Sequence, residues 1–368
     1  MYLDSVRLRN YRNYENQIIQ FDKGMNIIIG NNGEGKTNLL ESIYLLSTTR
    51  SHRIDENKEL IRFDSEFGSI EGNVISNNQT TKLSVIVHKK GKTLLINNNM
   101  VRKTSEFIGR FNAVLFAPDD MNLFDDSPRI RRRLFDIEIG KLYAVYMYDM
   151  NSYLKYLKER NNYLKGNVEP VMLETLTEML YKPQIGIIME RNIFINKVNE
   201  YISSYYSQIS GEDHHLKVEY KSIIEEKNDE ELMLNQLKTL YRNIQDRDIY
   251  LKQTNTGIHR EDYVFYLDDK NVSLYCSQGQ KRTVILALKM AIMQIIYDIR
   301  KEYPVLLLDD MFSELDSSRR YNILKLLPAS IQTIITTTDA REAELIKDKS
   351  VNFISIRKGM MENAYKQR

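Results

Sequence analysis

Residues 30–37 read Gly-Asn-Asn-Gly-Glu-Gly-Lys-Thr (GNNGEGKT), between the apolar segment NIIIG at 26–30 and the segment KTNLLESIYLL at 36–46. The stretch matches the pattern G-x-x-x-x-G-K-[ST], and its flanks predict the preceding strand and following helix that the pattern requires. Its glycines let backbone N–H groups curl around phosphate, and the helix N-terminus adds positive potential. The predicted phosphate-binding residues are Gly30, Asn31, Asn32, Gly33, Glu34, Gly35, Lys36 and Thr37.

The last two residues of this loop have distinct predicted roles in binding a nucleotide such as ATP. Lys36 is expected to contact the β- and γ-phosphates and is a candidate catalytic residue, whereas Thr37 is expected to ligate Mg²⁺. A second segment, VLLLDD at 305–310, predicts a parallel strand that is buried on both faces and ends in carboxylates. We expect Asp309 to hold the Mg²⁺ shell and Asp310 to orient or deprotonate the attacking water.

The segment SQGQKR at 277–282 opens a long apolar run that predicts a buried helix. Ser277, followed three residues later by Gln280, forms a capping box at the helix start. Gly279 in the first turn is unfavourable by roughly 1 kcal/mol relative to Ala, and the cations that follow it lie near the positive end of the helix dipole. Sequences violate local preferences mainly at functional sites, so this helix start is a candidate site.

The length and composition of the chain limit which classes of protein it can belong to. The chain has 368 residues, 42% of them hydrophobic, which is ample for a core, and its single cysteine, Cys276, excludes an internal disulfide framework. The N-terminus carries charges where a signal peptide needs an apolar core, and no run approaches 18 uncharged apolar residues, so we expect a cytoplasmic protein. The formal net charge of +2 gives no overall basic field, and any DNA-binding surface must be local.

The order of predicted elements divides the chain into three parts. Short strands fill the first part, long helices with apolar stripes follow from about Ser127, and strands return after about Thr254. We expect Pro183 to break or kink one of the middle helices, and DYVFYLDDKNVSLY at 262–275 to form a β-hairpin. The expected organisation is α/β, with residues 1–126 and 254–368 forming one nucleotide-binding domain and 127–253 a helical insertion.

The order of these motifs resembles the ABC-type ATPases. A phosphate loop, an S-x-G-Q helix start, an apolar strand ending in two acids, and then SELD at 313–316 follow one another as in that class. The resemblance implies a head with a mixed sheet, a P-loop core and an antiparallel β subdomain. It also implies that Ser277, Gly279 and Gln280 face the γ-phosphate bound to an opposing protomer in a head-to-tail homodimer, and that Ser313 and Asp316 belong to the D-loop.

Three further stretches are similar to the RecF family of bacterial recombination mediators: LRNYRNY at 8–14, APDDMNLFDDSPRIRRRLFD at 117–136 and TGIHRED at 256–262. The resemblance extends from end to end and places Asn10, Arg12 and Asn13 among the ATP contacts. It implies a nucleoid-associated protein that dimerises with ATP on double-stranded DNA and gap junctions. The implied partners are RecR and, indirectly, RecO, RecA and the single-strand-binding protein, and a weak DNA-stimulated ATPase would act as a timer.

The sequence departs from the family pattern at several positions. Asp126 and Leu134 replace the usual Gly and aromatic residue of the arginine-rich segment. Asp310 is one methylene shorter than the usual Glu, and only Thr338 or Asp339 is available where ABC proteins carry a switch histidine. These last two differences weaken the positioning of the attacking water and are consistent with slow turnover. The segment at 118–120 replaces the usual glutamine contact.

Two arginine clusters are candidate DNA contacts. We expect Arg50 and Arg53 to lie on the nucleotide or DNA face of the dimer, because Arg binds phosphate bidentately. For the cluster at 129–133 the sequence favours an intramolecular role slightly over DNA contact. His259 and Arg260 are expected to be structural near the head, and His214 and His215 to lie in a surface loop, not a metal site.

Two other classes of protein compete with this interpretation. A transporter-type ABC subunit is disfavoured by the helical insertion, and no membrane partner is expected. A nuclease-coupled ATPase is disfavoured because the chain leaves little room after its last predicted head strand.

Overall fold

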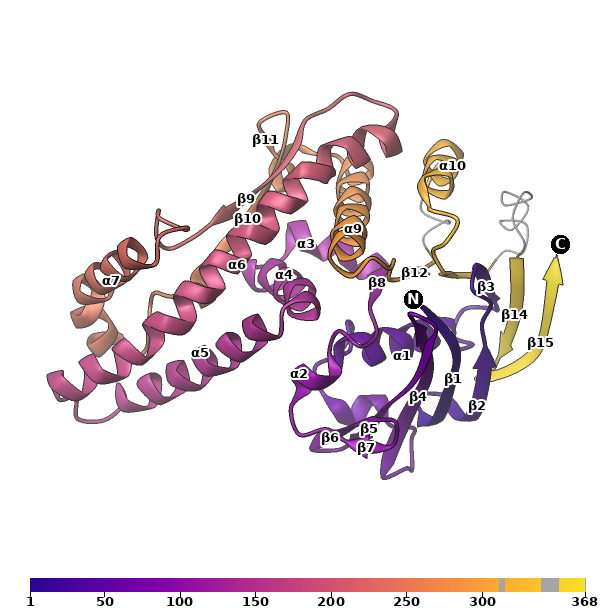
Figure 1. Ribbon diagram of the computed structural model, residues 1–368, viewed down its shortest axis with the longest axis horizontal. Helices are drawn as coiled ribbons and strands as arrows, with labels where there is room; N and C mark the ends of the chain where they lie inside the picture. The colour runs from indigo at the N-terminus through magenta and orange to yellow at the C-terminus, as the bar shows by residue number, and fades with distance from the viewer. Residues whose placement is uncertain (311–314, 339–350, 368) are drawn as a thin grey trace. The chain divides into compact units, whose positions relative to one another are not determined.

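The structure, a computed structural model, describes residues 1–310, 315–338 and 351–367. These residues form two compact units (Figure 1). The head unit comprises residues 1–121, 204–213 and the described part of 278–368, and the helical unit comprises 122–203 and 214–277. The helical unit is therefore inserted in two pieces.

A six-stranded sheet in the order β15-β14-β3-β13-β12-β8 carries the phosphate loop of the head unit. β3 runs parallel to β13 and β14, β12 runs parallel to β13 and β8, and β15 pairs antiparallel with β14. The central strands are almost wholly buried, as expected for parallel strands covered on both faces. The strands are β3 (Met25–Ile29), β8 (Ala113–Phe116), β12 (Val305–Asp309), β13 (Thr333–Thr337), β14 (Val351–Arg357) and β15 (Met360–Gln367).

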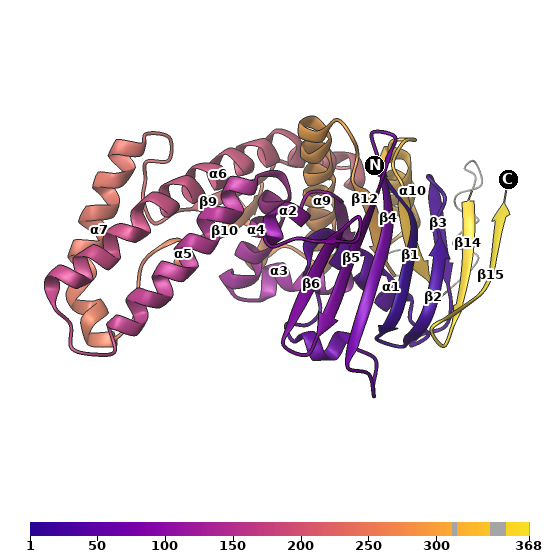
Figure 2. The same ribbon diagram turned by 60° about the horizontal axis from the view of Figure 1, so that its bottom comes forward.

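A second, antiparallel sheet of the head unit has the order β2-β1-β4-β5-β6-β7 (Figure 2). Burial alternates along β4, so that one face of the sheet packs on the core and the other faces solvent. The strands are β1 (Tyr2–Tyr11), β2 (Tyr14–Gln20), β4 (Phe67–Ser76), β5 (Gln79–His88), β6 (Gly91–Ile96) and β7 (Asn99–Met100). The predicted antiparallel β subdomain is confirmed.

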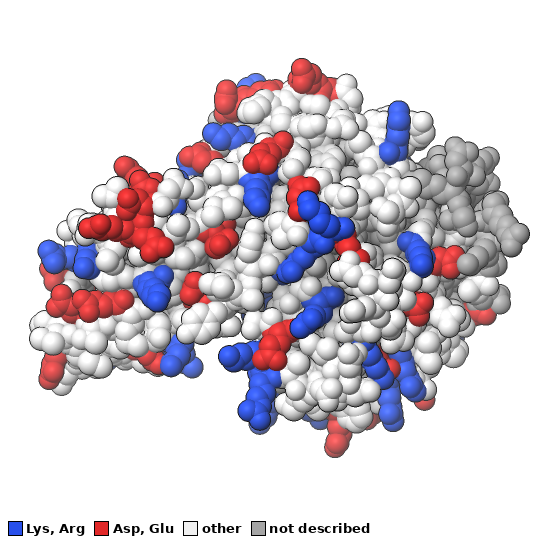
Figure 3. All heavy atoms as spheres, viewed as in Figure 1, with Lys and Arg blue, Asp and Glu red and all other residues white. Residues whose placement is uncertain are grey.

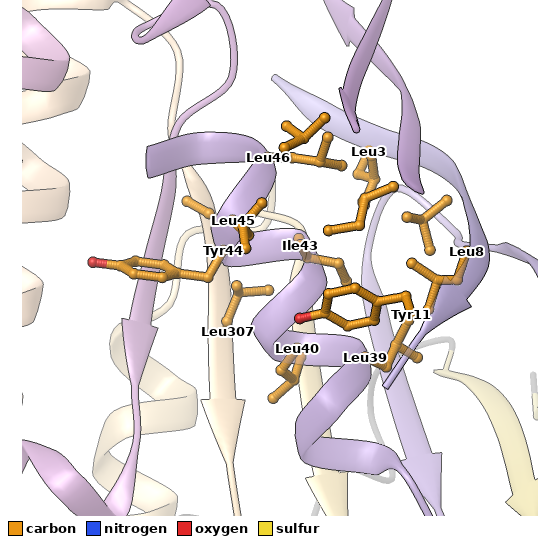
Figure 4. Close-up of a cluster of buried hydrophobic side chains, with 14 of the residues drawn as sticks. Leu3, Leu8, Tyr11, Leu39, Leu40, Ile43, Tyr44, Leu45, Leu46 and Leu307 are labelled. Atoms are coloured by element: carbon orange, nitrogen blue, oxygen red, sulfur yellow. The ribbon is translucent and has the colours of Figure 1, made fainter. Parts of the chain in front are cut away.

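Helix α1 (Lys36–Thr48) packs in the core between the two sheets. Figure 4 shows its leucine and isoleucine side chains against Leu3, Leu8 and Tyr11 of β1 on one side and Leu307 of β12 on the other. This packing fixes the N-terminus of α1, where the phosphate loop ends. The other helices in the described part of the head unit are η1 (Asn57–Leu60), α2 (Thr104–Phe107), η2 (Pro118–Met121), α9 (Gln278–Arg300) and α10 (Ser317–Leu326).

The helical unit contains four long helices and a three-stranded sheet in the order β11-β10-β9. The long helices are α4 (Pro128–Leu142), α5 (Ala144–Tyr163), α6 (Pro170–Ser210), whose last turns belong to the head unit, and α7 (Glu230–Leu251). The remaining elements are α3 (Asn122–Asp125), β9 (Leu216–Lys221), η3 (Ile258–Arg260), β10 (Asp262–Leu267), β11 (Lys270–Asn271) and α8 (Val272–Tyr275). The described part of the chain contains no helix with a stretch apolar enough to cross a membrane.

Several expectations for this unit need correction. The hairpin expected at 262–275 has a second arm of only two residues, after which the chain turns into α8. The main partner of β10 is β9, which the sequence analysis missed, and this pairing places residues 254–277 in the helical unit instead of the head. Of the break or kink expected at Pro183, the break is absent, because Pro183 lies inside the continuous helix α6.

The arginine-rich segment and the TGIHRED segment bind each other. Arg131 forms a bidentate ion pair with Asp262, at 2.7 and 3.0 Å, and Arg132 donates to the carbonyl of Glu261 at 2.5 Å. The carboxylate of Glu261 accepts from the buried Arg191 at 2.6 Å. The intramolecular role expected for this cluster is therefore confirmed for Arg131 and Arg132.

A buried ion pair connects the C-terminal turns of α5 and α7 in the helical unit. The Arg160 guanidinium donates to Asp248 at 2.8 Å and to the hydroxyls of Thr177 and Thr254 at 2.9 and 2.7 Å. The side chains of Arg160 and Asp248 are 1% and 0% exposed. A buried charge that loses its partner is strongly destabilising, so the helical unit depends on this pair.

Replacing Arg160→Met is expected to lower the free energy of unfolding by about 3–5 kcal/mol, because Asp248 is left buried without its cation. Urea unfolding followed by circular dichroism measures the loss. The control is Arg247→Met, which removes an exposed arginine of α7. Equal unfolding midpoints for the two variants would show that the Arg160–Asp248 ion pair does not stabilise the helical unit.

Two partly buried histidines are predicted to make the protein acid-sensitive. Burial lowers the pKa of His52 and of His259 to about 4. His259, which belongs to the helical unit, contacts the hydroxyl of Tyr153 at 2.6 Å through Nδ1. In the unfolded chain both imidazoles take up a proton near pH 6.5, whereas in the folded protein they do so only near pH 4. The free energy of unfolding is therefore highest above pH 6.5 and decreases as the pH falls toward 4.

The melting temperature is therefore expected to fall between pH 7 and pH 5, and to fall less in His259→Gln than in the unsubstituted protein. Calorimetry at several pH values tests this slope. His88→Gln, which changes an exposed histidine, serves as the control. The same pH slope in both variants would refute the role of His259.

Candidate functional site

The phosphate loop joins β3 to α1 at the carboxyl end of the parallel strands. Gly33 and Gly35 have φ angles of +81° and +115°, in the range that favours glycine. A Cβ atom at Gly30 would lie 2.5 Å from the carbonyl oxygen of Ile356 in β14. These glycines are therefore required by the shape of the loop and by its close contact with the sheet.

Lys36 lies within the curve of this loop. Its Nζ donates to the carbonyl oxygens of Gly30 and Asn31 at 2.6 and 3.0 Å, and the residue is 7% exposed. Burial lowers the pKa of Lys36, although the carboxylates of Asp310 and Asp309 act in the opposite direction. The ammonium group is thus held by backbone carbonyls at the position where a phosphate-binding lysine is needed.

Asp309 connects three segments of the chain. Its Oδ1 accepts from the hydroxyl of Thr37 at 3.1 Å and from the hydroxyl of Thr336 at 2.7 Å. The residue is 4% exposed, and burial raises its pKa in spite of both hydrogen bonds. The predicted metal-binding pair, Thr37 and Asp309, is therefore brought together by the fold.

Thr336 of β13 is a residue that the sequence analysis missed. Besides holding Asp309, its hydroxyl accepts from the backbone N–H of Asp310 at 2.9 Å, where the chain turns with a φ of +47°. Thr338, one of the residues considered for the switch position, is exposed, and Asp339 lies outside the described residues. The only signal for Thr336 in the sequence is its place in the segment QTIITTT at 332–338, whose pattern is typical of a strand.

The segment at 8–14 donates hydrogen bonds to backbone carbonyls of the phosphate loop. Asn13 Nδ2 donates to the carbonyl of Glu34 at 3.0 Å, and Tyr14 donates to the carbonyl of Gly35 at 2.9 Å. Asn38 donates to Asn13 Oδ1 at 2.9 Å, and Arg53 donates to Asn38 at 3.2 Å. Asn13 and Arg53 are therefore connected to the loop by one hydrogen-bonded chain.

Arg12 and Asn10, two of the expected ATP contacts, form hydrogen bonds within the head unit. Arg12 forms a bidentate ion pair with Glu41 of α1, with both N···O distances at 2.9 Å. Glu41 is fully buried and also accepts from Tyr11 and Ser51, and these hydrogen bonds outweigh burial and lower its pKa. The carbonyl of Asn10 accepts from the N–H of Arg62 at 2.9 Å. The structure thus assigns Arg12 a partner within α1.

Ser277, Gly279 and Gln280 lie at the start of α9, and Asp316, the described residue of the expected D-loop, lies at the start of α10. Ser277 is the last residue of the helical unit, and Gly279 and Gln280 lie in the first turn of α9 in the head unit. Asp316 caps α10 by accepting from the N–H of Arg319 at 2.9 Å. Ser313 lies outside the described residues.

The segment at 118–120 forms η2 and contacts α9. Asp120 Oδ1 forms an ion pair with Lys289 of α9 at 3.1 Å, and Oδ2 accepts from the N–H of Ala117 at 2.9 Å. The two side chains are 17% and 9% exposed. Lys289 interrupts the apolar run of α9, and this pairing gives the reason, which the sequence did not reveal.

The described residues contain no group of three or more His, Cys, Asp or Glu placed to hold a metal ion. His214 contacts Asp268 at 2.5 Å in a polar part of the helical unit, in agreement with the expected surface loop. The pair predicted from the sequence, Thr37 and Asp309, is therefore still the candidate metal-binding site.

Comparison with known proteins agrees with this fold and site. Residues 2–364 match the family described as RecF/RecN/SMC N terminal domain. The Smc head domain of Pyrococcus furiosus shares the fold, with a TM-score of 0.56 and 17% identity over 100% of this chain and 96% of that one. The fold and the phosphate loop define an ABC-type ATPase of the RecF/RecN/SMC class.

More similar proteins identify the family within this class. The DNA replication and repair proteins RecF of Bacillus cereus (strain G9842) and Bacillus pumilus (strain SAFR-032) are both 39% identical to this chain. They match over 95% and 94% of it and over 95% and 98% of their own lengths. A solved structure described as the recombination mediator protein RecF-ATP in the RecFOR pathway superposes with a TM-score of 0.90 and 33% identity, covering 98% of both chains. The chain belongs to the RecF family.

Replacing Thr336→Val is expected to lower nucleotide binding or turnover about 10- to 100-fold, as for other residues that orient a metal ligand. Valine keeps the shape but leaves Asp309 with one hydroxyl partner. Titration with a fluorescent ATP analogue and steady-state hydrolysis measure the two effects. Thr80→Val, which changes an exposed threonine of β5 outside the site, is the control, and an equal loss in both variants would contradict the role of Thr336.

Proposed function

We propose that this chain is an ATP-dependent, DNA-binding recombination mediator that acts in the repair of gaps left by replication. The observation that carries the proposal is the contact between Thr37 of the phosphate loop and Asp309 at the end of β12. In this proposal the contact would join the two halves of an ATP site, and the match to RecF proteins over nearly the whole chain supports it.

The residues present fit ATP together with Mg²⁺. The loop glycines leave backbone N–H groups for the phosphates, and Lys36 lies beside them as a cation. Asp309 and Thr37 supply the carboxylate and hydroxyl oxygens that Mg²⁺ prefers. When bound, the ion neutralises charge on the β- and γ-phosphates.

Slow hydrolysis is part of the proposal. Asp310 is the candidate to orient or deprotonate the attacking water, and its shorter side chain reaches less far than Glu. Its backbone N–H is held by Thr336 at 2.9 Å, which fixes the turn that carries the carboxylate. We propose that a weak, DNA-stimulated ATPase times the release of the protein from DNA.

The active form is proposed to be a head-to-tail homodimer with ATP between the protomers. Ser277, Gly279 and Gln280 of one protomer would then meet the γ-phosphate bound to the other. Gly279 has no side chain to obstruct this approach, and an arriving anion would offset the cations that follow it in the first turn of α9. The homodimer would bind duplex DNA at gap junctions.

The partners proposed for this chain follow from its relatives. The solved relatives are described as recombination mediators in the RecFOR pathway, and we propose that this chain also works with RecR and, through it, RecO. In this role it would help RecA to replace the single-strand-binding protein. Its place would be the cytoplasm, in association with the nucleoid.

Mixing two disabled variants tests the composite site. Lys36→Met removes the cation that binds phosphate, and Ser277→Arg places a bulky side chain where the γ-phosphate of the opposing protomer would lie. Each variant alone is expected to stay monomeric with ATP, whereas the 1:1 mixture forms dimers through its one intact interface. Sedimentation velocity with and without ATP measures this.

The same mixture without ATP is the control and should contain no dimer. Circular dichroism establishes that both variants are folded. If folded variants fail to complement each other with ATP, the head-to-tail site is wrong.

A further inference from the structure

Positive charge is concentrated in one part of the head unit. Residues 67–103 contain a single acidic residue, Glu71, although the whole chain has nearly equal numbers of acidic and basic residues. Glu71 is paired with Lys82 at 2.9 Å. The remaining cations of this segment are Lys89, Lys90, Lys92, Arg102 and Lys103.

The strand register brings these cations to one end of the antiparallel sheet. Lys89 and Lys90 form the turn between β5 and β6, where His88 pairs with Gly91. The N–H of Val101 donates to the carbonyl of Leu94 at 2.9 Å, so the chain after β7 runs back along β6 toward the same turn. Arg102 and Lys103 follow this paired segment directly, and the chain bends at Arg102 before α2 begins at Thr104.

Arg50 adds a further positive charge at this end. Lys92 Nζ donates to the carbonyl of Thr49 at 2.8 Å, at the end of α1, and Arg50 is the next residue. Burial and the charge of Arg50 lower the pKa of Lys92 to about 8, although the carboxylate of Glu41 acts in the opposite direction. The Lys92 and Arg50 cations are thus held close enough to each other for the charge of one to act on the other.

The exposed members of this group form no ion pair with an acidic side chain within the described residues. Lys89, Lys90, Arg102 and Lys103 are exposed and form none of the ion pairs found there. Figure 3 shows several Lys and Arg side chains, with acidic atoms directly beside them, where Figure 1 draws α2, which follows Lys103 and carries the exposed Glu106, so basic side chains are in excess there. Such a local field attracts a polyanion.

We propose that Arg50, Lys89, Lys90, Lys92, Arg102 and Lys103, here called the basic sheet end, bind the phosphate backbone of double-stranded DNA. The proposal rests on the proposed function and adds the surface that contacts the duplex. Cations on two neighbouring segments can neutralise several phosphates at once without reading sequence.

The surface fits a duplex better than a single strand. Binding of single strands relies on aromatic rings on which successive bases stack. The aromatic side chain that the register places next to the turn is Phe67, opposite His88 and 38% exposed. One ring offers one stacking position, whereas the cations extend over a turn and an adjacent segment.

The test compares two triple variants of the full chain in saturating ATP. Lys89→Gln, Lys90→Gln and Lys103→Gln neutralise the basic sheet end. Lys158→Gln, Lys165→Gln and Lys238→Gln remove the same charge from exposed positions of the helical unit. Fluorescence anisotropy with a labelled 30-base-pair duplex, at several salt concentrations, measures affinity and its dependence on salt.

The sheet-end variant is expected to bind duplex about tenfold or more weakly, and its slope of log affinity against log salt should decrease by about 1 for each lysine that contacts phosphate. The control variant should match the unsubstituted protein, and both should still dimerise with ATP. This result supports the proposal.

Three results would overturn the assignment. Equal duplex affinity and salt slope in the two variants would reject the basic sheet end while leaving the proposed function intact. A loss confined to a single-stranded oligonucleotide, or to vesicles containing phosphatidylserine, would assign the surface to another ligand. Failure of the unsubstituted protein to bind duplex DNA with ATP would reject the proposed function itself.

Discussion

One buried carboxylate oxygen, Asp309 Oδ1, connects the elements on which the candidate site depends. It receives a hydroxyl from Thr37, which follows the loop after β3, and another from Thr336 of β13. β13 lies between β3 and β12 in the parallel sheet, so the contact is a direct consequence of strand order. Burying a carboxylate is costly, and the two hydroxyls offset part of that cost while they fix its orientation.

The loop is rigid because both of its sides are supported by packed structure. Asn13 and Tyr14 hold the carbonyls of Glu34 and Gly35, and the backbone N–H of Lys358 donates to the Glu34 side chain. Behind α1, the buried Glu41 is neutralised by Arg12. A loop held in this way binds phosphate without first having to be ordered, which lowers the entropic cost of binding.

Sequence patterns predicted the elements that depend on local signals. The phosphate loop, α1, α9 and the apolar strands β3, β12 and β13 were recognisable because glycine spacing, capping and apolar runs are properties of neighbouring residues. Strand β9 was missed although its burial alternates, because it is a short segment between long helices. Pro183 did not end α6, since tertiary packing overrides a single unfavourable residue.

Pairings between distant residues could not be predicted in the same way. Nothing near Arg12 in the sequence indicates Glu41, nothing near Lys289 indicates Asp120, and Thr336 is one of several threonines in its strand. The division at 253 was misplaced for the same reason, because the pairing of β9 with β10 determines which unit the later residues join. These contacts depend on topology, which a single sequence expresses only weakly.

The position of β3 in the sheet has a consequence for synthesis of the chain. Its neighbours are β13 and β14, which lie close to the other end of the sequence. At a ribosomal rate of about 5–20 residues per second, β3 waits roughly 15–60 s for them. During that time the strands of the antiparallel sheet can already pair with one another. A ribosome that stalls within the helical unit therefore leaves an apolar strand with two open edges, which is the arrangement most prone to pair with another chain.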